Sequence, residues 1–149
     1  MLYVRPMDSH DIDQVLAIEQ RSFDHGWSRQ QFLDEATQPG HAVVCEEDGL
    51  ILGYLCLRWV ADEAEVLDIA VLPEARRRGV ARDLLNWGFQ QAQQVGATIV
   101  HLEVRETSQP AIELYQQQGF QVVGRRPGYY PGGIAALLMT KHIARNDDI

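Results

Sequence analysis

The hydrophobic pattern of this chain changes its period at Gly79. Before that residue, EAEVLDIAVLP (residues 63–73) reads as a strand that continues a sheet and ends at Pro73, because proline cannot donate to a sheet ladder. After it, apolar residues recur at helical spacing until a stop near Gly96. The apolar helical positions are Val80, Leu84, Leu85, Trp87 and Phe89. The sequence therefore predicts a strand, a short turn and a helix in immediate succession.

The N-terminal half predicts one strand, two helices and a hairpin. Residues 2–6 read as a strand, after which Asp8 or Ser9 can cap a helix. The apolar positions of that helix are Ile12, Val15, Leu16 and Phe23. Ser28 and Gln31 have the spacing of a capping box, which starts a second helix. Two β-rich runs within residues 41–60 then meet at Glu47-Asp48-Gly49, where glycine after aspartate suits a tight turn.

The C-terminal half predicts a strand over residues 97–104 and then another helix. Pro110 falls in the first turn of that helix and Gly119 just beyond its last turn. Two final β-like runs flank a turn-rich loop, PGYYPGG, which carries Tyr129 and Tyr130. The resulting order, β-α-α-β-β-β-α-β-α-β-β, predicts an α+β fold with a central mixed sheet flanked by helices.

Composition narrows the class of protein. The 149 residues, 46% of them hydrophobic, suit one domain spanning residues 1–149. No apolar stretch approaches the length that spans a bilayer, and no leader pattern opens the chain, so we expect a cytoplasmic protein without a membrane partner. Cys45 and Cys56 each sit in a strand-like run and read as buried free thiols.

Charge is concentrated unexpectedly at Arg76-Arg77-Arg78, inside a chain whose formal net charge is -8. Because the first N–H groups of a helix lack intrahelical acceptors and carry the positive end of the helix dipole, a turn at this place suits a phosphate group. Two alternatives remain open from these residues: a solvated helix start, or a nucleic-acid patch that includes Arg125 and Arg126. A pI near 5.0 argues against broad nucleic-acid binding.

With that turn, the chain resembles the GCN5-related N-acetyltransferases, whose coenzyme A loop has the form Q/R-x-x-G-x-G/A after a central strand. Arg76, Gly79 and Ala81 match this form. The resemblance implies that the coenzyme A moiety of acetyl-CoA is bound by two segments. The backbone of Ile69, Ala70 and Val71 would hold the pantetheine arm, and the loop amides of Arg77, Arg78, Gly79, Val80, Ala81 and Arg82 would hold the pyrophosphate.

Residues 102–120, LEVRETSQPAIELYQQQGF, and the following RRPGYYP resemble one branch of that family more closely. It is the bacterial branch that acetylates the N-terminal alanine of a small-subunit ribosomal protein. Its pattern places asparagine where this chain has Ser108, whose hydroxyl would make the coenzyme contact. The resemblance therefore implies an acetyl-CoA-dependent N-α-acetyltransferase whose partner is the N-terminal peptide of a basic protein, acting as a monomer or weak homodimer.

Two residues are candidate acid–base groups for that reaction. Glu103 lies near the end of a strand on the same alternating side as Ile99 and His101, and it is either a solvated glutamate or a base. Tyr115 continues an i, i+3, i+4 stripe with Ala111 and Ile112, which by itself reads as core. The resemblance implies that Glu103 is the general base and Tyr115 the general acid.

Three aromatic residues are candidates for binding the acceptor: Trp27, Tyr129 and Tyr130. The two tyrosines read equally well as exposed loop aromatics, and Trp27 also suits a hydrophobic staple before a helix. The five histidines and two cysteines lack metal-ligand spacing, so no metal is expected. Other acceptors, namely another N-terminus, a lysine or a small amine, remain open, as does a coenzyme-binding module without catalysis.

Overall fold

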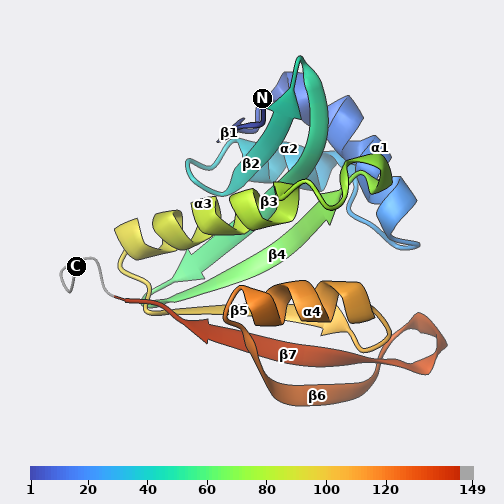
Figure 1. Ribbon diagram of the computed structural model, residues 1–149, viewed down its shortest axis with the longest axis vertical. Helices are drawn as coiled ribbons and strands as arrows, with labels where there is room; N and C mark the ends of the chain where they lie inside the picture. The colour runs from blue at the N-terminus through green and yellow to red at the C-terminus, as the bar shows by residue number, and fades with distance from the viewer. Residues whose placement is uncertain (145–149) are drawn as a thin grey trace. The chain divides into compact units, whose positions relative to one another are not determined.

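The computed structural model describes residues 1–144, and its helices and strands follow the predicted order (Figure 1). The strands are β1 (Tyr3–Pro6), β2 (Ala42–Glu47), β3 (Leu50–Val60), β4 (Glu63–Val71), β5 (Ile99–Arg105), β6 (Gln121–Tyr130) and β7 (Ile134–His142). The α-helices are α1 (Ile12–Ser22), α2 (Arg29–Ala36), α3 (Val80–Gln94) and α4 (Gln109–Gln117). Short 3₁₀ turns are η1 (Ser9–Asp11), η2 (Pro73–Ala75) and η3 (Pro131–Gly133).

The strands form a mixed sheet in the order β1-β2-β3-β4-β5-β7-β6. β4 and β5 are parallel, with Glu63 opposite Ile99, whereas β1–β2, β2–β3, β5–β7 and β6–β7 are antiparallel pairs. The parallel pair requires a crossover connection, which α3 supplies. The predicted α+β class with a central mixed sheet is thereby confirmed.

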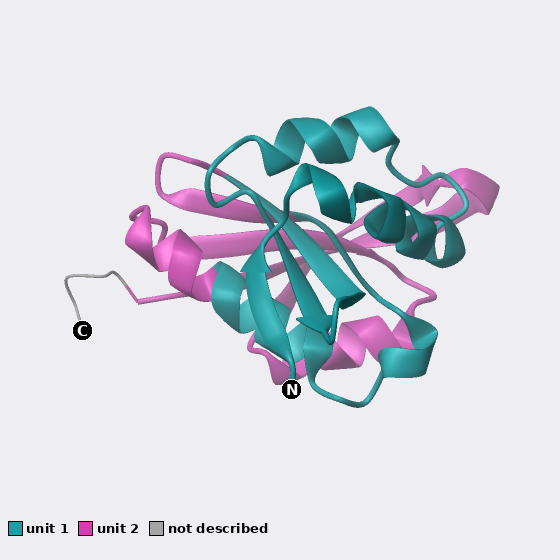
Figure 2. Ribbon diagram, turned by 90° about the horizontal axis from the view of Figure 1, so that it is seen from above, with its two compact units in different colours: residues 1–58, 67–88 teal, residues 59–66, 89–149 magenta. Residues whose placement is uncertain are grey.

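Two compact units make up the chain (Figure 2). The first consists of residues 1–58 and 67–88, and the second of residues 59–66 and 89–149, of which the structure describes those up to 144. The boundary between them falls within β3, β4 and α3. A single domain over residues 1–149 stays a prediction.

The core of the first unit packs apolar residues of α1 and α2 against β2 and β3. Its largest fully buried members include Phe32 and Tyr54, whose ring centroids are 5.4 Å apart. Local signals set the ends of these elements as predicted. Ser28 and Gln31 make both bonds of the capping box, and Asp48 and Gly49 turn the hairpin with positive φ angles of 52° and 83°.

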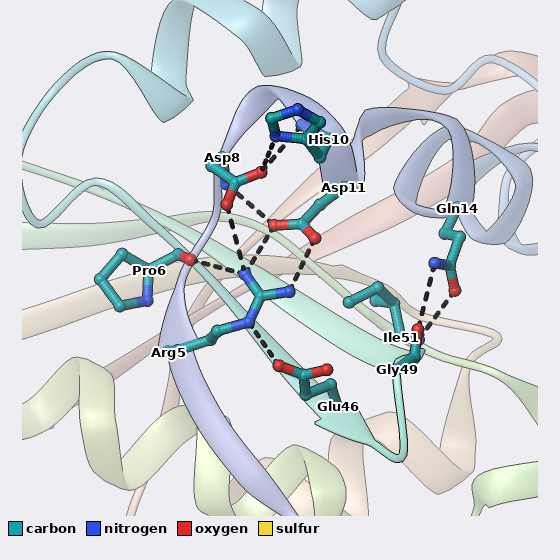
Figure 3. A network of polar contacts seen from close by, with 9 residues as sticks. All are labelled: Arg5, Pro6, Asp8, His10, Asp11, Gln14, Glu46, Gly49 and Ile51. Carbon is teal, nitrogen blue, oxygen red and sulfur yellow. Dashed lines mark hydrogen bonds and ion pairs between the residues drawn. The ribbon is translucent and has the colours of Figure 1, made fainter.

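A polar network ties β1 to the start of α1 and to β2 (Figure 3). The guanidinium of Arg5 donates two hydrogen bonds of 2.8 Å to Asp11 and one of 2.6 Å to Glu46. Asp11 also accepts the Asp8 N–H at 2.9 Å. Burial opposes ionisation of Asp11, yet these hydrogen bonds hold the pKa of its carboxyl below the ordinary value. The network therefore holds the N-terminal strand β1 to the start of α1 and to β2.

Two expectations about element ends are wrong. Phe23 lies after α1 in extended conformation and packs against the core from there, because the helix ends at Ser22. Tyr129 and Tyr130 belong to the end of β6 and not to a loop, since Tyr130 pairs with Ile134 of β7 after a register shift that follows Arg126. Gly128, with a φ of 65°, absorbs this irregularity.

Cys45 and Cys56 are buried free thiols, as predicted. Among the residues that the structure describes, no helix is long and apolar enough to cross a membrane.

Candidate functional site

The end of β4 carries the predicted pantetheine segment, Ile69 to Val71. Ala70 is buried, and its neighbours Ile69 and Val71 are partly exposed. Gly53 of β3 lies directly against this segment, because a Cβ there would come within 2.9 Å of the Ala70 carbonyl oxygen and 3.0 Å of Val80. A glycine at position 53 thus lets β3, the end of β4 and the start of α3 pack closely.

The turn from β4 into α3 presents backbone N–H groups. Arg77 and Gly79 both have positive φ angles, of 66° and 79°, and α3 begins at the next residue, Val80. The Asp83 N–H donates to the Gly79 carbonyl at 3.0 Å, which closes the first helical turn. The preceding N–H groups, those of residues 80–82, have no earlier helical carbonyl to reach. This geometry is a backbone nest at a helix N-terminus, which favours an anion.

The arginine side chains of the turn are less available than their number suggests. Both Nη atoms of Arg78 bind the Glu47 carboxylate, with Nη1 to Oε1 at 3.0 Å. This contact raises the pKa of Arg78 and lowers that of Glu47. The Arg82 guanidinium lies over Gly79, 2.7 Å from where a Cβ would stand. The anion site therefore depends on the backbone more than on free cationic side chains.

The same pairing weakens the nucleic-acid interpretation. Arg125 binds Glu106, and Arg126 lies 3.4 Å from Glu103, so both arginines outside the turn face a carboxylate. With Arg78 held by Glu47, three of the five arginines in the supposed patch are locally neutralised. A protein binds nucleic acid through unpaired cationic side chains, which displace the counterions of the phosphate backbone.

Glu103 lies on β5, on the partly exposed side of the alternation that also carries His101. Its side chain is 26% exposed, and Oε1 is 3.4 Å from Nη1 of Arg126. Tyr129 hydrogen-bonds to Glu103, and the Glu103 charge together with this bond raises the pKa of the Tyr129 hydroxyl. Within the second unit, therefore, the structure brings the predicted base and one predicted acceptor-binding tyrosine into contact.

The two tyrosines stand edge to face, with ring centroids 5.1 Å apart. Arg126 lies over the Tyr129 ring at 5.6 Å, and Arg105 over the Tyr130 ring at 4.5 Å. Burial raises the pKa of Tyr130, while Tyr129 is 50% exposed. Both rings are thus held by cations, and the hydroxyl of the exposed one, Tyr129, contacts Glu103.

Tyr115 is buried in the second unit with its ring 6.0 Å from that of Phe120. Phe120 also contacts Phe89, at a centroid distance of 5.8 Å. The ring of Tyr115 therefore has the core role that its helical spacing indicated. Ser108 precedes α4 as its N-cap, but its side chain makes no capping hydrogen bond to the helix.

Trp27 closes a hydrophobic staple in the first unit. It precedes the N-cap Ser28, and its ring lies 5.2 Å from that of Phe32, the fourth residue of α2. Its backbone N–H donates to Oε2 of Glu19 at 2.8 Å. Trp27 is partly exposed, so it can pack on the core and still present part of its ring.

Sequence reasoning missed a buried acidic cluster beside the predicted coenzyme strand. Glu19 of α1 and Asp68 of β4 are 2% and 8% exposed, and both lie against Tyr54 of β3. Burial and the neighbouring Glu19 raise the pKa of Asp68 to about 9. A signal existed in the sequence: Asp68 alternates with Val66 and Ala70 on the buried side of β4, where a charge is unexpected.

Over residues 1–144, no group of histidine, cysteine, aspartate and glutamate side chains could hold a metal ion.

Comparison with known proteins relates this geometry to a family. A sequence profile described as acetyltransferase (GNAT) family matches residues 12–120. A Bacillus subtilis (strain 168) protein assigned to the ribosomal protein bS18-alanine N-acetyltransferases is 35% identical over 139 residues, which cover 91% of this chain and 92% of that protein.

Two solved structures share the fold along nearly the whole chain. The ribosomal-protein-S18-alanine N-acetyltransferase from Escherichia coli has a TM-score of 0.86 at 28% identity, covering 99% of this chain and 98% of that one. Chaetomium thermophilum Naa20, solved in complex with a bisubstrate analogue, has a TM-score of 0.87 at 25% identity, with coverage of 98% and 89%.

Proposed function

Because this chain belongs to the acetyltransferase (GNAT) family, we propose that it transfers the acetyl group of acetyl-CoA to the N-terminal α-amino group of a protein. The acceptor we propose is the N-terminal alanine of a small-subunit ribosomal protein, the class for which the Bacillus subtilis and Escherichia coli relatives are named. The observation that carries the chemistry is the nest at Arg77 and Gly79, which suits the pyrophosphate of a coenzyme.

Acetyl-CoA supplies an activated thioester. In our proposal the backbone of Ile69, Ala70 and Val71 binds the pantetheine arm, and the amides of residues 77–82 bind the pyrophosphate. The Ser108 hydroxyl, which is not used as a helix cap, donates to or accepts from the coenzyme. The neutralised Arg78 leaves the backbone as the main source of affinity.

The acceptor amine must lose a proton before it attacks, because a free α-amino group has a pKa of about 8. Glu103 accepts that proton, directly or through water, while the amine nitrogen forms a bond to the thioester carbon. The tetrahedral intermediate then collapses with cleavage of the C–S bond. Tyr115 protonates the departing thiolate, and the products are an acetylated N-terminus and coenzyme A.

For binding the acceptor peptide we assign Trp27 in the first unit and, separately, Tyr129 and Tyr130 in the second. Tyr129 contacts Glu103, so a peptide held against its exposed ring would bring its amino group near the base. A net charge of -8 favours a basic peptide, in keeping with ribosomal proteins. We place the reaction in the cytoplasm, where buried free thiols such as Cys45 and Cys56 persist.

The proposal is tested by acetyl transfer from labelled acetyl-CoA to a basic peptide that begins with alanine. Polyamines, aminoglycoside antibiotics and the same peptide with a blocked N-terminus but free lysines serve as rival acceptors. We expect transfer to the free N-terminus only, and mass spectrometry of N-termini in cells with and without the protein should then identify the natural acceptor. Transfer to the blocked peptide or to the small amines, with none to the free N-terminus, would refute the proposal.

A further inference from the structure

Glu19 of α1 hydrogen-bonds to two other parts of the first unit, the segment before α2 and strand β3. Its carboxylate accepts the backbone N–H of Trp27 at 2.8 Å through Oε2 and the hydroxyl of Tyr54 through Oε1. Glu19 itself is only 2% exposed. A buried carboxylate is costly unless donors surround it, so both donors are needed to keep this side chain in place.

The segment that connects α1 to α2, residues 23–28, is shaped around Glu19. A Cβ on Gly26 would lie 2.6 Å from Cγ and 2.9 Å from Oε2 of Glu19, closer than real contacts allow. Gly26 has no positive φ angle, so close approach and not backbone conformation requires glycine there. The segment therefore passes directly over the Glu19 carboxylate and delivers the Trp27 N–H to it.

Asp68 adds a proton to this arrangement. It hydrogen-bonds to Glu19, while its Oδ2 is buried without a hydrogen-bond partner among the described residues. Two adjacent buried carboxylates repel, and a hydrogen bond between them requires a proton on one of the two, which the raised pKa assigns to Asp68. The titratable groups that face the pair are Tyr54 and Cys56 of β3, and Glu35 of α2 in turn interacts with Cys56; burial raises the pKa of both Tyr54 and Cys56. Tyr54 and Cys56 therefore stay protonated and add no charge beside the pair.

We propose that Glu19, paired with Asp68, is a positioning residue for the acceptor substrate: it anchors residues 23–28 and thereby fixes Trp27. This inference rests on the proposed function, because that function assigns Trp27 to the acceptor site. Asp68 directly precedes the strand segment 69–71 to which we assign the pantetheine arm, so the pair joins the acceptor segment to the coenzyme strand through α1 and β4.

Steady-state kinetics with an N-terminal peptide and acetyl-CoA test the anchor. In Glu19→Gln the amide can accept from only one of the two donors, and Gly26→Ala displaces the carboxylate. We expect each variant to raise the KM for the peptide about tenfold, the effect of one lost hydrogen bond to a charged group, with the KM for acetyl-CoA within about twofold of wild type. Equal increases in both KM values would overturn the proposal.

Asp11→Asn is the matched control. Asp11 is a buried carboxylate in η1, directly before α1, and its partners are Arg5 and the Asp8 N–H (Figure 3) and not residues 23–28. We expect this variant to leave the peptide KM within about twofold of wild type even if it lowers Tm. A rise equal to that of Glu19→Gln would mean that any damage to the helix has the same effect, which contradicts a specific anchor.

Asp68→Asn tests whether the anchor requires a protonated Asp68. Asparagine keeps a neutral hydrogen-bonding group at every pH, whereas the pKa of Asp68 is about 9. The ratio of the wild-type peptide KM to that of Asp68→Asn cancels ionisation of the amine itself. We expect the ratio to be near one at about pH 7 and to rise toward about pH 10, as the second charge disrupts the pair. A ratio that stays constant over this range overturns the role of Asp68.

Hydrogen exchange at the Trp27 amide measures the anchor without any substrate. We expect this amide to be protected in wild type and in Asp68→Asn, and to exchange about tenfold faster in Glu19→Gln, as expected when its acceptor is lost. If no peptide is acetylated but the exchange result holds, the proposed function fails and the anchor stands. If peptides are acetylated but Trp27 exchange is unchanged in Glu19→Gln, the anchor fails and the function stands.

Discussion

Nη1 of Arg126 lies 3.4 Å from Oε1 of Glu103 across the intervening strand β7. A carboxylate proposed as a general base thus has a cation beside it, and the two effects of a Glu103 substitution, loss of the base and loss of the ion pair, must be separated. The Arg126 side chain is 55% exposed, and exposed ion pairs of this kind contribute little to stability.

We expect Glu103→Gln to lower kcat about 10²–10⁴-fold with an unchanged Kd for coenzyme A, because glutamine keeps the shape but cannot accept the proton. Arg126→Gln is the matched control, since it removes the same ion pair and leaves the carboxylate. Its kcat should stay within about tenfold of wild type. Rapid-quench measurement of acetyl transfer would check both variants, and equal losses would assign the effect to the ion pair.

Tyr115→Phe removes one hydroxyl and leaves the edge-to-face contact of the ring with Phe120. We expect Kd for coenzyme A to stay within about twofold and kcat to fall by about tenfold or more, because the thiolate then departs without a proton donor. A more acidic leaving thiol on the acyl donor should restore part of the lost rate.

Phe120→Leu provides the packing control for Tyr115. It removes the aromatic contacts with both Tyr115 and Phe89, so Tm should fall while the response to the leaving thiol stays that of wild type. Unchanged turnover in Tyr115→Phe would remove its role as the general acid.

Gly79→Val should weaken coenzyme binding more than Arg76→Ala does. A non-glycine residue at a φ of 79° costs about 1–2 kcal/mol, and the new side chain would also displace the Arg82 guanidinium. We expect calorimetry to show about a tenfold higher Kd for coenzyme A, against a smaller change in Arg76→Ala, since the backbone supplies the nest.

Gly96→Val is the control that separates the backbone strain of replacing a glycine from a direct effect on coenzyme A binding. Gly96 has a φ of 87° with no atom near its Cβ position, so it carries a similar backbone penalty outside the turn. Its Tm should fall as in Gly79→Val while its Kd stays that of wild type. If Arg76→Ala bound coenzyme A more weakly than Gly79→Val does, this result would contradict binding by the backbone nest.

Features set by neighbouring residues were predictable from the sequence. The capping box of Ser28 and Gln31, the turn at Asp48-Gly49 and the helix start after Gly79 each depend on a few consecutive residues, and each is present in the structure. The family pattern also indicated Glu103 and Tyr115, which periodicity alone assigned to a strand and a core stripe.

Features set by distant residues were not predictable. The sequence could not show that Arg126 faces Glu103, because β7, which lies between β5 and β6 in the sheet, follows both in the chain. Proline and glycine before Tyr129 indicated a loop, yet pairing of Tyr130 with Ile134 overrides that local signal. The contact between Glu19 and Asp68 likewise joins residues far apart in the chain.

The buried Asp68 makes stability depend on pH in an unusual direction. Its pKa is about 9 in the folded protein and near the ordinary 3.8 when unfolded, so between these values the folded state binds more protons than the unfolded state. The stabilising contribution of the protonated carboxyl is therefore fully present below about pH 4 and is lost progressively as the pH rises to about 9.

The side chain at position 68 cannot titrate in Asp68→Asn. The free energy of unfolding of this variant, relative to that of wild type, should therefore increase as the pH rises. We expect the difference to grow by up to about 1.4 kcal/mol per pH unit, less where Glu19 shares the titration, and to level off above about pH 9. Urea unfolding of both proteins across this range measures it. Since every other titrating group is common to the two proteins, a difference that is independent of pH would show that Asp68 is ionised in the folded state at neutral pH.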